Sequence, residues 1–301
     1  GGRDAFYAYR RKLLLDKPDG FVPPAKKGAA LWPIVATHMG VTGTRRASMR
    51  SHMTEYGREA TNPFSVRLRF DRVKAGRFKE ELFGENVFFN ASSIGLYDED
   101  IEEVVGSGGL IGVSLDARIL GYQSLTQRLG QDHDYDYFSR EDFAVLFPDL
   151  ASSLPILREL AEPTTNTAEL TQPVFGNEAL VATNRRTREL YLFCLNVLHI
   201  VAVTKAITPV VAEPWRYVCI GSDYDGLIDS LQAARTIEQM PAFRRELLNF
   251  FPAAEKAYRK LRPAVGDLLP RSGGNPDVEN VLEALFYENG RRFLEEWWAK
   301  T

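Results

Sequence analysis

Short apolar runs without polar alternation recur along the chain, and each ends in polar or glycine residues. The clearest is Tyr217–Ile220, which continues into a Gly/Ser/Asp cluster at residues 221–226. A run of this kind predicts a strand that is buried on both faces. Three further strands of the same type are expected over residues 31–40, 86–93 and 110–116.

Segments with helical periodicity separate these strands. The first, residues 4–16, predicts a short helix with Phe6, Tyr9 and Leu13, bordered by Leu14, on one face. The others are expected over residues 41–61, which are basic, and over 71–82, 98–105, 187–207, 241–262 and 278–298. The alternating residues 65–70 fit a half-exposed strand or an extended connector. Strands that alternate with helices predict an α/β fold with parallel βαβ units.

Composition narrows the class of protein. The chain has 301 residues, of which 45% are hydrophobic, and a net charge of -3 with both signs mixed along it. This composition is ordinary for a globular protein, and the length suits one large domain as easily as two small ones; we expect a single domain over 1–301. The mixed charges do not point to a nucleic-acid surface. Cys194 and Cys219 lie in apolar runs and are expected to be buried thiols. Without a signal-peptide pattern or an apolar run judged long enough to span a membrane, we expect a cytoplasmic protein with no membrane partner.

A polar insertion over residues 123–177 interrupts the alternation. A connection of this length in a compact domain is expected to be a lid over the strand ends or an interaction surface. His133, which acidic residues flank, could bind a metal or belong to a solvated acidic loop. His52 is expected to be a solvated helix residue, and His199 a packing residue within an apolar helix.

Three polar side chains follow two of the expected strands and carry the candidate chemistry. Asp223 and Asp225 come directly after Tyr217–Ile220, and His38 stands near the end of the 31–40 run. Ligands of α/β proteins bind at the C-terminal ends of parallel strands, where carboxylate and imidazole side chains can hold a divalent metal. Two structural alternatives stay open. The aspartates could form a turn that caps the next helix, and His38 could be a hydrogen-bonded loop residue.

The segment Ile220–Gly226, preceded by a helix that contains Leu198–Ile200, resembles the last strand of the membrane (renal) dipeptidase-like proteins. These proteins belong to the metal-dependent amidohydrolase superfamily. Five more segments are similar to the family in the same order along the barrel, namely Ala36–Gly40, Asn90–Ser93, Leu96–Ile101, Gly108–Ile111 and Glu288–Leu294. The resemblance covers residues 30–120 and 190–298.

This resemblance implies a TIM-type (β/α)8 barrel, or its C-terminal portion of strands five to eight. It implies a divalent metal, with zinc as the expected ion, held by His38 and Asp223. Asp223 is also expected to be catalytic, while Ser92, Asp225 and Arg118 are expected to contact a small-molecule substrate. The implied reaction is hydrolysis of an amide or ester bond through metal-activated water.

Three departures from the family pattern bear on activity. No two of the four histidines lie two residues apart, so the early His-x-His or His-x-Asp pair is absent. Ala91 stands where the family has its sixth-strand histidine, and the arginine that binds the substrate carboxylate has no match between Ser92 and Asp98. A bulkier or uncharged amide or ester is therefore expected rather than a dipeptide.

The sequence therefore leaves two hypotheses. A metal-dependent hydrolase needs about three protein ligands and eight strands, so the missing ones would come from a longer chain, a homo-oligomer or a partner chain. Alternatively, the protein is a non-catalytic amidohydrolase-like scaffold that lost its metal ligands and serves binding or assembly. Ala91 favours the scaffold, while His38 and Asp223 favour the hydrolase.

Overall fold

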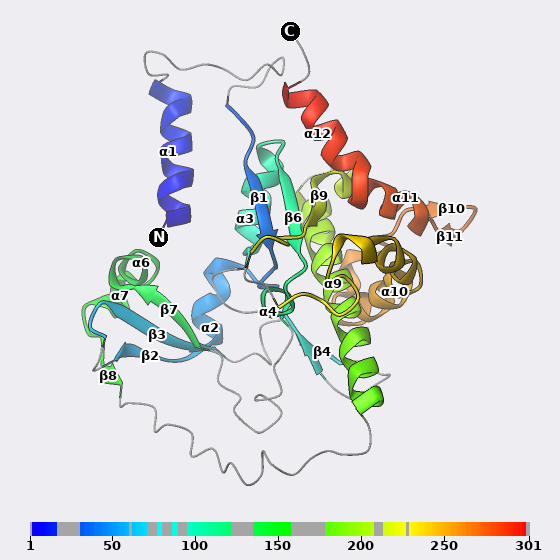
Figure 1. The fold of residues 1–301 in the computed structure, drawn as a ribbon. Helices are drawn as coiled ribbons and strands as arrows, with labels where there is room; N and C mark the ends of the chain where they lie inside the picture. Colours follow the sequence, from blue (N-terminus) through cyan, green and yellow to red (C-terminus); the bar gives the residue numbers. More distant parts are fainter. Residues whose placement is uncertain are drawn as a thin grey trace.

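A parallel sheet of three strands lies at the centre of the computed structural model (Figure 1). Its strands are β1 (Val35–Met39), β6 (Leu110–Ser114) and β9 (Val218–Gly221), in the order β1-β6-β9. Both pairings are parallel, with Val35 opposite Leu110 and Cys219 opposite Gly112. The parallel arrangement that the apolar runs predicted is therefore confirmed for these three strands.

The structure describes residues 2–16, 31–59, 62–70, 77–79, 86–89, 95–121, 135–157, 178–207, 213–226 and 229–298. Over these residues the fold is mixed α/β, and their strands close no barrel. The eight-stranded barrel is thus not shown. The coarser expectation, an α/β fold with a parallel sheet, is confirmed.

The central strand β6 is buried along its whole length. The helices α3 (Asp98–Gly106) and α9 (Glu178–Ile207) pack against it and against each other. The helix α10 (Met240–Leu261) packs on α9 from the outside. A strand covered in this way needs no polar alternation, which is why Leu110–Val113 carries no polar side chain.

The strand expected over residues 86–93 does not join the parallel sheet in its described residues, 86–89. Its described part, β5 (Asn86–Phe88), pairs antiparallel with β4 (Arg77–Lys79), so β1 pairs directly with β6. The prediction of a third parallel strand at this place is wrong, and so is the predicted helix at 77–79. Contacts between segments that are distant in sequence determine which strands pair, and local periodicity does not encode those contacts. Ala91 and Ser92 lie outside the described residues.

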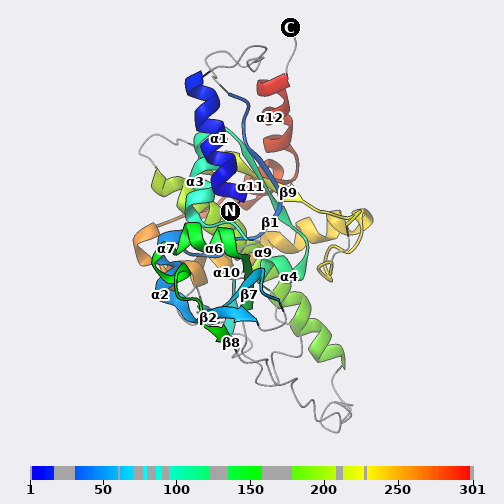
Figure 2. The same cartoon turned by 90° about the vertical axis from the view of Figure 1, so that its left-hand side faces the viewer.

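A second sheet of four strands lies beside the first and below α1 in both views (Figures 1 and 2). Its order is β7-β3-β2-β8, and a small core that includes Val66, Leu68 and Phe143 joins it to nearby helices. The elements are β2 (Met53–Glu59), β3 (Ser65–Phe70), β7 (Tyr135–Ser139), α6 (Arg140–Leu146), α7 (Pro148–Ala151) and β8 (Ile156–Leu157). The described part of the predicted lid thus contributes two strands to a sheet.

The basic helix expected over residues 41–61 is also wrong in most of its length. Only a short turn η1 (Arg46–Ser48) and α2 (Met49–His52) are helical before β2 begins. Gly57 lies in β2 so close to β8 that an added Cβ would stand 2.7 Å from Pro155 O. The pairing with β3 and β8 therefore overrides the helix-like pattern. The strand predicted at 65–70 is confirmed as β3.

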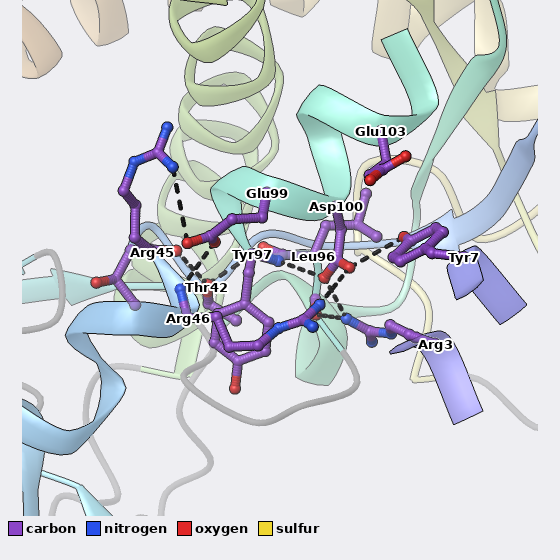
Figure 3. A network of polar contacts seen from close by, with 12 residues as sticks. Arg3, Tyr7, Thr42, Arg45, Arg46, Leu96, Tyr97, Glu99, Asp100 and Glu103 are labelled. Carbon is purple, nitrogen blue, oxygen red and sulfur yellow. Dashed lines mark hydrogen bonds and ion pairs between the residues drawn. The ribbon is translucent and has the colours of Figure 1, made fainter. Parts of the chain in front are cut away.

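The N-terminal helix α1 (Gly2–Asp16) docks through polar groups rather than through its predicted apolar face. Phe6 and Tyr9 are 49% and 60% exposed. On the docking side, Arg3 donates to a buried Asp100 carboxylate at 2.7 Å and Tyr7 donates to it at 3.0 Å (Figure 3). The carboxylate is fully satisfied because Arg46 and the backbone N–H of Tyr97 donate to it as well. Hydrogen bonds and an ion pair to Asp100, rather than the predicted apolar face, therefore attach α1 to the rest of the fold.

The C-terminal helices follow the predicted pattern. They are α11 (Val278–Glu283), a π-helical turn η5 (Ala284–Glu288) and α12 (Asn289–Trp298). Asp277 accepts a hydrogen bond from the backbone N–H of Asn280 and is the N-cap of α11. Trp297 is buried and donates to Gly108 O, whereas Trp298 stacks on Trp32 and stays half-exposed. Of these two tryptophans, only Trp297 therefore packs α12 into the rest of the fold.

The helix α9 contains an apolar run that is longer than we expected from the sequence, where no run was judged long enough to span a membrane. Its segment Arg186–Ile207 is long and apolar enough to cross a membrane, and 83% of its apolar window is buried inside the fold. A core helix passes the same test of length and composition. Cys194 on α9 is fully buried, as predicted, while Cys219 on β9 is partly buried. Burial raises the pKa of the Cys219 thiol to about 12, so it is not an activated nucleophile.

Candidate functional site

The C-terminal edge of the parallel sheet brings together His38 and Asp223. His38 lies near the end of β1, and Asp223 follows β9 by two residues. These are the only non-glycine residues in the described part of the chain with positive φ, at 60° for His38 and 57° for Asp223. Such backbone conformations cost free energy in L residues and are found preferentially at functional sites.

A bulge in β1 explains the conformation of His38. Ala36 pairs with Ile111 and Met39 with Val113, so three steps on β1 match two on β6. The extra residue takes Thr37 and His38 out of the regular register. Bulges re-aim a side chain at the end of a strand. Here the bulge accompanies the placement of the imidazole at the sheet edge, facing the β9 loop.

The distance between the two side chains is longer than a hydrogen bond and close to the separation of two ligands of one cation. His38 Nδ1 lies 3.7 Å from Asp223 Oδ1, beyond hydrogen-bonding distance. Two ligands of one tetrahedral zinc ion, at bond lengths of about 2.0–2.2 Å, lie about 3.3–3.6 Å apart. The side chains are 44% and 30% exposed, so an ion and a substrate can reach them. Imidazole nitrogen and carboxylate oxygen are both good zinc donors, so the pair fits the ion.

Two glycines permit this approach. An added Cβ on Gly221 would stand 2.9 Å from the backbone N of His38 and 2.9 Å from Gly112 O. On Gly112 it would stand 3.1 Å from the Cα of Gly221. The outer strands therefore come close to each other over the central strand, and only residues without a side chain allow it.

The β9 loop is anchored by its own turn and by Tyr224. The backbone N–H of Gly226 donates to Asp223 O at 2.9 Å. The Tyr224 hydroxyl donates to Ala234 O at 3.1 Å. Asp225 is exposed at the tip of the turn. The structure thus places both aspartates of the motif at the sheet edge, with Asp223 turned to His38 and Asp225 to solvent.

Arg118 lies on the short helix α4 (Ala117–Leu120), which follows the end of β6. Its guanidinium forms a bidentate ion pair with the buried carboxylate of Asp116, with Nη2 at 2.6 Å. This hydrogen bond raises the pKa of Arg118, so the group stays cationic. Asp116 also caps α4 by accepting from the Arg118 backbone N–H. The side chain of Arg118 is 62% exposed, which leaves it accessible from solvent at the sheet edge.

The donor set at this edge is small in the part of the chain that the structure describes. Nowhere among those residues do three His, Cys, Asp or Glu side chains gather in a group that could hold a metal ion. Ser92 and His133 lie outside the described residues. The described site therefore offers two ligands, His38 and Asp223.

A second histidine–aspartate pair was not predicted. His199 Nε2 lies 2.8 Å from Asp98 Oδ1, and its Nδ1 lies 2.9 Å from the Tyr258 hydroxyl. The imidazole is fully buried between α3, α9 and α10. His199 was expected to be a packing residue, and Asp98 a charge at a helix start. Neither pattern signalled their contact, because the partners come from three separate helices.

Charge and burial act against each other in this buried network. Burial lowers the pKa of His199, and the hydrogen bond with Asp98 only partly offsets this. Burial also works to raise the pKa of Asp98, but the hydrogen bond from His199 and the charge of Arg262 outweigh it and lower that pKa. A neutral His199 then donates from Nε2 to the carboxylate and accepts from the Tyr258 hydroxyl. Every polar atom of the imidazole is satisfied.

No protein-family model, curated protein or solved structure matches the chain. The resemblance to the dipeptidase-like proteins therefore stays a prediction that rests on its motifs.

Proposed function

We propose that this protein is a metal-dependent hydrolase of the amidohydrolase type that acts on an amide or ester bond. The observation that carries the proposal is the meeting of His38 and Asp223 at the C-terminal edge of one parallel sheet. Their strands are distant in sequence, both residues have positive φ, and their donor atoms are 3.7 Å apart. Strained backbone with accessible donor groups at this edge is the expected arrangement of a ligand site.

His38 Nδ1 and Asp223 Oδ1 would hold a divalent cation, with zinc as the expected ion. Such a cation supplies Lewis acidity toward a carbonyl oxygen. The second carboxylate oxygen of Asp223 can accept a proton from an attacking water, which makes this residue the candidate base. Asp225 and Arg118 border the same edge and would contact substrate, with Arg118 offering a cation to a polar group.

A catalytic zinc site uses about three protein ligands, so the pair needs at least one more donor. We propose that it comes from residues outside the described part, or from further strands of a TIM-type barrel of which β1, β6 and β9 are the C-terminal portion. Parallel pairing and helices between successive strands support this arrangement. A homo-oligomer or a partner chain could supply the same strands.

Metal analysis of the purified full chain tests the proposal. After dialysis against zinc and then against zinc-free buffer, the protein should retain stoichiometric zinc by mass spectrometry. His38→Ala and Asp223→Ala should lose it. His52→Ala, a histidine at the end of α2, is the matched control and should keep it. Equal retention in all four proteins would place the metal elsewhere and reject this site.

The second candidate is a non-catalytic amidohydrolase-like scaffold. It is favoured by the lack of a third metal ligand among the described residues and by Ala91 at a ligand position of the resembled family. This candidate predicts no zinc in any preparation, and no change on His38→Ala. The same analysis therefore separates the two functions.

A further inference from the structure

Gly226 lies against the carboxylate of Asp223. An added Cβ at this position would stand 2.6 Å from Oδ1, 2.8 Å from Cγ and 2.8 Å from Oδ2 of Asp223. Non-bonded heavy atoms do not approach so closely, because carbon contacts are optimal at about 3.5–4.0 Å. The carboxylate of Asp223 thus occupies the space that any side chain at residue 226 would need.

The backbone around this contact is held from two directions. Asp223 takes a φ of 57°, and its carbonyl accepts from the Gly226 N–H, so the turn folds Gly226 back onto the carboxylate. The Tyr224 hydroxyl donates to Ala234 O and also lies within hydrogen-bonding distance of Thr236 O. With the turn anchored in this way, the carboxylate has more freedom to move than the main chain.

We propose that Gly226 is a positioning residue for Asp223. Its missing side chain leaves the carboxylate room to point toward His38, at 3.7 Å, a separation close to that of two ligands of one cation. The consequence for metal binding rests on the proposed function, whereas the consequence for the Asp223 side chain does not.

The other glycines at this edge show why Gly226 is the informative one. Added Cβ atoms on Gly221 and Gly112 would meet backbone atoms, at 2.9 Å and 3.1 Å, so substitution there would push strands apart. At Gly226 the obstacle is the end of one rotatable side chain. A Gly226→Ala substitution should therefore disturb the site while leaving the fold intact.

The experiment compares the full chain with Gly226→Ala and with Gly106→Ala. Gly106 ends α3 and has nothing within 4 Å of an added Cβ, so it controls for the change of residue type. The Asp223 rotamer is measured from three-bond NMR couplings, and zinc affinity by calorimetry. We expect a new rotamer and at least about tenfold weaker zinc binding in Gly226→Ala, in line with losses of supporting contacts at metal sites. Melting temperatures should stay close to that of the parent protein.

The outcomes are distinct. An unchanged Asp223 rotamer in Gly226→Ala would overturn the positioning role, and so would a large fall in its melting temperature, which would assign Gly226 to the fold. If the parent protein binds no zinc but the rotamer shifts, the proposed function fails and the positioning role stands. If zinc binds equally to all three proteins, the positioning role fails and the proposed function is untouched.

Discussion

Two histidine–aspartate pairs in this protein differ in exposure and in hydrogen bonding, and they show how surroundings change what the same side chains can do. His199 and Asp98 are 2.8 Å apart, and the imidazole is buried and bonded at both nitrogens. His38 and Asp223 are 3.7 Å apart, accessible and held on left-handed backbone. A saturated buried pair stabilises the fold, whereas an open pair with spare donors is free to take a ligand. The same residue types thus stand in opposite surroundings.

The sharpest test of this contrast removes each imidazole in turn. His199→Ala should lower the free energy of unfolding by about 2–4 kcal/mol, because it removes a hydrogen-bond partner from the partly buried Asp98 and from the buried Tyr258 hydroxyl, and it opens a cavity. His38→Ala should change it by less than about 0.5 kcal/mol. Urea denaturation measures both. Equal losses of unfolding free energy would show that the two pairs contribute equally to stability.

The buried pair also predicts a pH dependence. The pKa of His199 is lowered by burial, so the unfolded chain binds a proton that the folded chain does not. Stability from this group is present above the ordinary pKa of 6.5 and is lost as the pH falls below it. The slope cannot exceed about 1.4 kcal/mol per pH unit for one proton.

His199→Gln should flatten that slope, and His38→Gln should leave it unchanged. Thermal melts between pH 7 and pH 5, as rough limits around the histidine range, provide the measurement. A slope that persists in His199→Gln would mean that another group causes it.

Backbone strain at the open pair gives a smaller effect. At a φ of 60°, glycine is more stable than alanine, so His38→Gly should exceed His38→Ala in stability by about 1 kcal/mol. Both variants should lack zinc. Denaturation and metal analysis of the two proteins check this. A more stable alanine variant would argue that residue 38 does not hold its left-handed conformation.

The smallest expected effect is that of Asp223→Asn. Asparagine tolerates positive φ, so unfolding should change by less than about 0.5 kcal/mol. Loss of the negative charge should still weaken zinc binding, since carboxylates are the oxygen donors zinc takes from side chains. Asp149→Asn, on the exposed helix α7, is the matched control for calorimetry.

Local sequence patterns correctly predicted the strands and helices that follow a single hydrophobic pattern. The apolar runs located β1, β6 and β9, and helical periodicity located α3, α9, α10 and the C-terminal helices. The order of strands and helices also predicted that His38 and Asp223 would end parallel strands. Patterns failed at residues 53–59 and 77–79, which form strands in the fold. The choice between helix and strand there depends on partners elsewhere in the chain.

The sequence by itself thus determined the parallel strands and the polar residues that follow them, because unbroken apolar runs have few other places in a folded core. Only the tertiary structure decided that Asp98 and Tyr258 meet the buried imidazole of His199. It also decided that Arg3 and Tyr7 attach α1 to Asp100, and that the Asp223 carboxylate lies in the space that a side chain at residue 226 would need. Each of these depends on a distance between segments that the chain brings together only when its core closes, and no local period encodes that distance.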